Sequence, residues 1–121
     1  MGENEKWILL AEDDRLFAKL FVRFWSEAFP QIRIRIVTSN KEGVVLLQNS
    51  ESRPALAVLD LNLSDGSSEE LRALLQCPSV TWSAVPGIGE AAPRQKPVGR
   101  AGLVEAVKDL GRIGQLDVPL Q

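Results

Sequence analysis

LAVLDLNLSDG, residues 56–66, is a continuous apolar run that ends in one carboxylate, Asp60, and continues into the turn residues Ser64, Asp65 and Gly66. Apolar runs without alternation are typical of strands covered on both faces, as in a parallel sheet with helices above and below it. We therefore expect Asp60 at the carboxyl edge of a central strand, where open α/β sheets place their sites.

The rest of the chain alternates between strand and helix patterns around this central strand. A short apolar run predicts a strand over residues 7–11, and the patterns of residues 32–37 and 79–84 predict two more. Helical periodicity and end signals predict helices over residues 15–29, 69–75 and 99–115. A cap at Ser39 or Asn40 predicts a further helix over residues 41–48, whose apolar residues are consecutive and not periodic. Such alternation with short connections predicts one parallel sheet with right-handed crossovers.

Two local patterns add detail to this arrangement. Isoleucine and arginine alternate over residues 32–37, which predicts a half-exposed strand at the edge of the sheet. The helix over residues 15–29 carries a wide apolar stripe that we expect to face the core. Its members are Leu16, Phe17, Leu20, Phe21 and Phe24.

The strand and helix pattern breaks in residues 85–95, which contain Pro86, Gly87, Gly89 and Pro93. If the residues just before Lys96 form a fifth strand, about seven remain for the crossover, fewer than the roughly ten to twelve that a helical crossover needs. The sequence therefore predicts an irregular link in place of a fourth crossover helix.

Composition limits the classes of protein to consider. The 121 residues suffice for one domain with a core, so we expect a single domain over residues 1–121. The net charge is −2 without a basic run, which argues against direct binding of nucleic acid. Cys77 is the only cysteine, so a reducing cytoplasm is expected. No apolar run approaches a membrane span, and residues 1–6 have no signal-peptide character.

Polar groups fall at the carboxyl ends of the expected strands: Glu12 and Asp13, Asp60, Ser83, and Lys96. Histidine is absent, which removes the commonest general base and the usual zinc ligand. Carboxylates about 7 Å apart repel by roughly 2 kcal/mol per pair at an effective dielectric near 20. A divalent cation relieves this repulsion, and hard oxygen ligands point to magnesium. One carboxylate can then attack phosphorus, while the metal and the lysine take up charge on the phosphoryl oxygens.

Taken in order, these segments resemble the receiver domain of bacterial two-component response regulators. Four motifs carry the resemblance, which covers nearly the whole chain: ILLAEDD at residues 8–14, LDLNLSDG at residues 59–66, Ser83-Ala84, and Lys96-Pro97. The resemblance implies a flavodoxin-like (CheY-like) α/β fold, doubly wound, with five parallel strands in the order 2-1-3-4-5.

The resemblance also implies a phosphoacceptor in signal transduction, not an enzyme with a separate substrate. Asp60 would accept a phosphoryl group from a histidine kinase or phosphotransfer protein. Ser83 would hydrogen-bond the phosphoryl oxygen, and Lys96 would pair with it.

By the same matching, Mg²⁺ is the implied cofactor. Asp13 and Asp60 would bind it with their carboxylates. Glu12 would bind it through water, and Asn62 through its backbone carbonyl.

The chain departs from this family in residues 85–95. Receivers normally have a fourth helix there and an aromatic switch residue about three positions before the lysine, where this chain has Pro93. We therefore expect an uncovered sheet face near Trp82 and Ile88 that binds a partner protein or a second copy of the chain. Switching would have to run through this segment and not through a helix shift.

Two other functions are compatible with parts of the pattern. A docking or dimerisation module with receiver architecture would act without phosphorylation, and the shortened segment favours it. An aspartate-nucleophile phosphatase of the haloacid dehalogenase type is disfavoured, because Asn62 stands where the general acid would be and cannot supply a proton.

Overall fold

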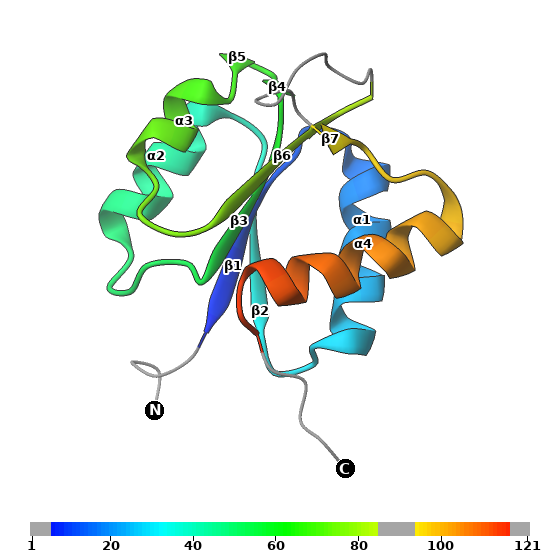
Figure 1. The fold of residues 1–121 in the computed structure, drawn as a ribbon. Coiled ribbons are helices and arrows are strands. Elements are labelled where there is room, and N and C mark those ends of the chain that lie inside the picture. The colour runs from blue at the N-terminus through cyan, green and yellow to red at the C-terminus, as the bar shows by residue number, and fades with distance from the viewer. Residues whose placement is uncertain (1–5, 85–93, 117–121) are drawn as a thin grey trace.

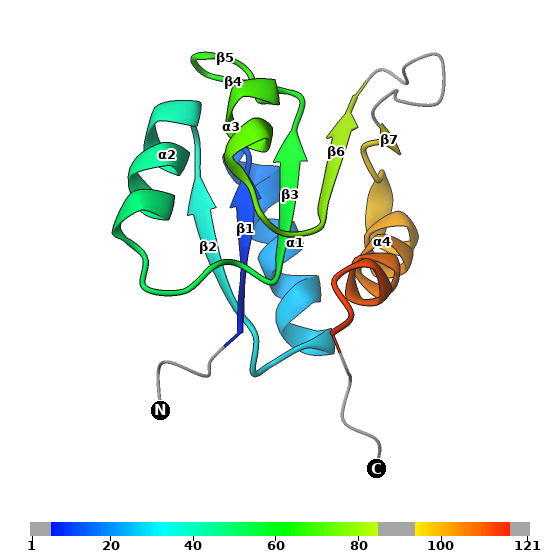
Figure 2. The ribbon, with the colours of Figure 1, turned by 60° about the vertical axis from the view of Figure 1, so that its left-hand side comes forward.

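The computed structural model describes residues 6–84 and 94–116, which build a parallel sheet between two layers of helices (Figure 1). The sheet has the order β2-β1-β3-β6-β7, which confirms the predicted 2-1-3-4-5 arrangement. Its strands are β1 (Trp7–Ala11), β2 (Arg33–Val37), β3 (Leu56–Asp60), β6 (Ser79–Ser83) and β7 (Arg94–Gln95). One face is covered by α1 (Arg15–Ala28) and α4 (Gly99–Ile113), the other by α2 (Asn40–Asn49) and α3 (Glu69–Leu74) (Figure 2).

The central strands β1 and β3 are buried on both faces, as their unbroken apolar runs predict. Alternate side chains of each strand enter the two cores. Ile8, Leu10, Leu56 and Val58 pack in the core under α1 and α4. Leu9, Ala57 and Leu59 pack in the core on the other face, with Leu71 of α3.

Strand β2 lies at the edge of the sheet and pairs with β1 alone, as predicted. Its burial does not follow the alternation of isoleucine and arginine in the sequence, because Arg33 and Ile36 are exposed while Ile34 and Arg35 are partly buried. The guanidinium of Arg35 lies 5.0 Å from the centroid of the Trp7 ring. After β3 the chain forms a small antiparallel hairpin of β4 (Asn62–Leu63) and β5 (Gly66–Ser67), where the sequence pattern indicates only a turn.

The inward face of α1 differs from the predicted stripe. Leu16 is 69% exposed and Leu20 is 39% exposed, so their predicted inward orientation is wrong. Phe21 and Trp25 occupy the centre of the buried face instead. The Trp25 indole reaches past the end of the helix, where its Nε1 donates a hydrogen bond to the Ile32 carbonyl at 3.1 Å. This hydrogen bond allows the indole to be fully buried.

The expected uncovered face at Trp82 is also corrected. Trp82 is only 3% exposed, because Phe17 and Phe21 of α1 pack edge-on against its ring at centroid distances of 5.7 and 6.0 Å. Ile88, Pro93 and the predicted irregular link lie outside the described residues.

Candidate functional site

The acidic cluster forms where β1 and β3 end side by side. The two strands are parallel and pair Ala11 with Leu59, so the next residue along each strand is an acid. Asp60 is the last residue of β3, and Glu12 follows β1 directly. The backbone N–H of Glu12 donates to the Val37 carbonyl at 2.9 Å, which continues the β1–β2 pairing and holds the main chain from which the carboxylate extends.

Glu12, Asp13 and Asp60 each have a carboxylate oxygen within 4.8 Å of the other two. Glu12 is buried at 1% exposure, Asp60 is partly buried, and Asp13 faces solvent. Three converging hard oxygen donors, open to solvent on the Asp13 side, suit Mg²⁺ or Mn²⁺. These residues therefore fit the divalent cation that the sequence resemblance implies.

Lys96 joins this cluster from the position directly after β7, the strand next to β6. Its Nζ lies 2.8 Å from Glu12 Oε1 and 3.4 Å from Asp60 Oδ2. The three side chains are between 0% and 15% exposed, so water screens the interaction weakly. One ammonium group neutralises only part of the charge of three carboxylates. The cluster therefore keeps negative charge that a bound cation would offset.

Burial changes the proton affinity of this site. Desolvation raises the pKa of Glu12 to about 7, helped by the neighbouring Asp60 and opposed by the hydrogen bond from Lys96. Burial by itself would lower the pKa of Lys96, but the hydrogen bond and charge of Glu12 outweigh it, and that pKa is raised. Lys96 is therefore cationic across the physiological range.

Ser83 lies on the strand beside Asp60, as predicted. The sheet pairs Asp60 with Trp82, which places Ser83 one residue further along β6. The Ser83 carbonyl accepts a 2.7 Å hydrogen bond from the Lys96 backbone N–H, and Ser83 is 7% exposed. The structure thus brings Ser83 and Lys96 to the same edge of the sheet as the acids.

Asn62 lies two residues after Asp60 and is the first residue of β4 in the β4–β5 hairpin. Its backbone N–H donates to Asp60 Oδ1 at 3.3 Å, and its side chain is exposed. The backbone of Asn62 is therefore next to the acidic cluster, which is where the resemblance places it.

Phe17 is a member of the site that the sequence pattern assigns only to the core. The Nζ of Lys96 lies 4.3 Å from the centroid of its ring, within the range of a cation–π interaction. No sequence signal marks this contact, because Phe17 belongs to an apolar stripe that already accounts for it.

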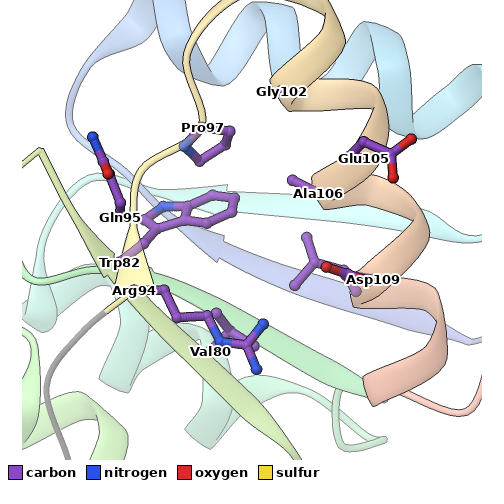
Figure 3. A pocket seen from close by; sticks show the side chains of 10 residues that line it. Val80, Trp82, Arg94, Gln95, Pro97, Gly102, Glu105, Ala106 and Asp109 are labelled. Carbon is purple, nitrogen blue, oxygen red and sulfur yellow. The ribbon is translucent and has the colours of Figure 1, made fainter. Parts of the chain in front are cut away.

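A pocket of about 240 Å³ lies between α4 and the β6–β7 edge, away from the acidic cluster (Figure 3). Trp82 and Pro97 lie on one side and Ala106 of α4 faces them. None of the acidic cluster residues lines the pocket, so it is separate from the candidate cation site.

The sequence matches no protein-family model, and no curated protein is significantly similar to it. Solved structures do resemble it. The phosphorylated cyanobacterial phytochrome response regulator RcpA is 22% identical, with a TM-score of 0.74 over 92% of this chain and 94% of that chain. The Mn²⁺-bound response regulator Rcp1 is 19% identical, with a TM-score of 0.73 over 95% and 99%. The non-phosphorylated receiver domain of HemR from Leptospira biflexa is 26% identical, with a TM-score of 0.70 over 96% and 99%.

The sheet order, the helix layers and the acidic edge define a doubly wound α/β protein with a candidate cation site at the carboxyl ends of its strands. More particularly, the chain has the CheY-like fold of a response regulator receiver domain. Glu12, Asp13 and Asp60 form the acidic cluster that is typical of the receiver metal site. No helix in residues 6–84 and 94–116 is long and apolar enough to cross a membrane.

Proposed function

We propose that residues 1–121 are a single receiver domain that accepts a phosphoryl group on Asp60 from a histidine kinase or phosphotransfer protein in the cytoplasm. The observation that carries this proposal is the position of Lys96, whose Nζ lies 2.8 Å from Glu12 and 3.4 Å from Asp60. A partly buried carboxylate beside an ammonium group and two further acids suits attack on phosphorus.

In the proposed reaction, a carboxylate oxygen of Asp60 attacks the phosphorus of a phosphohistidine on the partner. The oxygen–phosphorus bond forms as the nitrogen–phosphorus bond breaks, and its electron pair stays on the imidazole. Lys96 then pairs with a phosphoryl oxygen, and Ser83 donates a hydrogen bond to another. Hydrolysis of the acyl phosphate by water regenerates Asp60, so the chain returns to its starting state.

A divalent cation would be held by Asp13 and Asp60, with Glu12 acting through water and Asn62 through its backbone carbonyl. When bound, it supplies positive charge near the transferred phosphoryl oxygens. The donor set and the Mn²⁺ in the similar structure of Rcp1 support this assignment.

Exposed apolar side chains on two elements that border the site suit the phosphodonor partner. Leu16 and Leu20 lie one turn apart on α1, and Val98 is 79% exposed at the start of α4. Both elements border the site, because Lys96 lies over the Phe17 ring and Val98 follows Lys96 by two residues. A protein that docks on these side chains brings its phosphohistidine close to Asp60.

Incubation with acetyl phosphate and Mg²⁺, followed by intact mass measurement, tests this function. We expect addition of one phosphoryl group to the wild type, none to Asp60→Asn and none when EDTA replaces Mg²⁺. No adduct on the wild type would overturn the proposal and favour the docking module that acts without phosphorylation.

A further inference from the structure

The β4–β5 hairpin that follows Asp60 is tied to the start of α2 by a dense set of hydrogen bonds. In Figure 2 the hairpin lies at the same end of the molecule as the first turn of this helix. Ser64 donates to the Thr38 carbonyl through its hydroxyl at 3.0 Å and through its backbone N–H at 3.4 Å. The carboxylate of Asp65 accepts from the backbone N–H groups of Asn40 at 2.8 Å and Lys41 at 3.1 Å.

Asn40 is the side chain at the centre of this connection. It is 5% exposed, and its Nδ2 donates to Asp65 Oδ1 at 3.1 Å and to the Ser67 carbonyl at 3.0 Å, with a longer contact of 3.5 Å to the Gly66 carbonyl. A buried amide with two strong acceptors on one loop holds that loop in a single position.

The link from Asn40 to the acidic cluster is short. Ser67 pairs across the hairpin with Asn62, the residue whose backbone N–H donates to Asp60. The peptide before Asn62 is fixed as well, because the Leu61 carbonyl accepts from the Ser68 N–H at 2.8 Å. Asn40 thus holds the strand that pairs with Asn62.

We infer that Asn40 is a positioning residue for divalent cation binding, acting through the β4–β5 hairpin on the backbone of Asn62. The inference rests on the proposed function, because it takes the Asn62 carbonyl as one ligand. Outer residues that orient metal ligands typically change affinity by about 10- to 100-fold when they are replaced. The intrinsic helix propensity of asparagine is low, so stabilisation of the α2 helix by propensity does not explain an asparagine at this position. Asparagine is also common at helix caps, which is a separate reason for its presence near a helix start.

The test measures Mn²⁺ affinity directly, by counting free Mn²⁺ with electron paramagnetic resonance. We expect Asn40→Ala to bind Mn²⁺ about tenfold more weakly than the wild type. The matched control is Ser39→Ala, which removes the α2 cap that accepts from the Glu42 N–H at 3.1 Å but leaves every hairpin contact in place. Ser39→Ala is expected to keep wild-type affinity, although it lowers the unfolding midpoint.

Each outcome has one meaning. Equal affinities of the wild type and Asn40→Ala would overturn the positioning role, and so would an equal loss in Ser39→Ala, which would indicate general loosening of α2. A wild type that does not bind Mn²⁺ at all, like Asp60→Asn, would instead refute the metal site of the proposed function.

A second variant covers the case in which Asn40→Ala does not fold. Asp65→Asn keeps the shape of the acceptor but removes the charge that the two α2 amides bind. Its affinity is expected to fall below that of Glu70→Gln, which removes a comparable exposed charge in the first turn of α3. Equal affinities of these two variants would overturn the inference.

Discussion

Lys96 is closer to Glu12 than to Asp60, at 2.8 Å against 3.4 Å, so its ammonium group pairs mainly with the acid that is not the proposed phosphoacceptor. Glu12 has a side chain that is 0% exposed. We therefore expect the lysine to contribute to stability as well as to the proposed chemistry.

Lys96→Met is expected to destabilise the chain by about 3 kcal/mol at pH 8, because it leaves a buried carboxylate without its partner. The loss should be smaller at pH 5.5, where Glu12 can take up a proton. Urea unfolding at the two pH values measures this difference. The control, Lys108→Met, breaks an exposed pair with Glu105 and should change stability by no more than about 0.5 kcal/mol at either pH.

The raised pKa of Glu12 predicts how stability depends on pH in metal-free buffer. Between about pH 4.5 and pH 7 the folded chain holds a proton that the unfolded chain has released, so stability falls as pH rises through this window. A shift from 4.5 to about 7 corresponds to roughly 3 kcal/mol.

Glu12→Gln should flatten this part of the pH profile, measured by urea unfolding in the presence of EDTA. The lowered pKa values of Glu42 and Asp65 act in the opposite sense and at lower pH, since they favour the charged forms. A wild-type profile that rises from pH 4.5 to 7 would show that Glu12 is not the dominant group.

Removal of one acid from the cluster separates metal binding from charge. Asp13→Asn is expected to weaken Mn²⁺ binding at least tenfold, about 1.4 kcal/mol, because it removes one of the proposed carboxylate ligands. Asp14→Asn is the control, since Asp14 bears the same charge but caps α1 by accepting from the Phe17 N–H at 3.1 Å, a role that asparagine can fill. Similar losses in both variants would point to general electrostatics in place of a defined ligand.

Replacement of glycine by alanine is expected to have opposite effects on stability at two positions of α4. A Cβ at Gly111 would collide with the Phe29 ring, so Gly111→Ala should lower the free energy of unfolding by about 1–3 kcal/mol. The higher helix propensity of alanine offsets part of this loss. A Cβ at Gly102 would lie 3.7 Å from the Pro97 Cβ, an ordinary contact. Gly102→Ala should therefore stabilise the helix by up to about 1 kcal/mol. Thermal unfolding of both variants measures the contrast, and stabilisation by both would contradict the close approach of α4 to Phe29.

The sequence predicts the central part of the fold because burial on both faces leaves a clear pattern. β1 and β3 are unbroken apolar runs whose apolar residues are all buried. The alternation of isoleucine and arginine in β2 indicates its edge position, although its burial does not alternate. The site is predictable for a related reason. Parallel strands end at one edge, so Glu12, Asp60 and Lys96 converge once the strand order is known.

Other features leave no such pattern. Apolar residues occupy so much of the circumference of α1 that periodicity does not show which of them face the core. The buried orientation of Trp25 depends in part on the hydrogen bond from its indole to the Ile32 carbonyl. The contacts of Asn40 with the β4–β5 hairpin join polar residues more than twenty positions apart. Such contacts depend on the tertiary arrangement and have no periodic signal.

The most direct measurement is to locate the phosphoryl group. The chain is treated with acetyl phosphate and Mg²⁺, reduced with borohydride to convert an aspartyl phosphate to homoserine, and mapped by peptide mass spectrometry. We expect homoserine at residue 60 alone, and none in the Asp60→Asn variant. Homoserine at Asp13 or Asp65 instead, or an unmodified chain, would contradict the assignment of Asp60 as the phosphoacceptor.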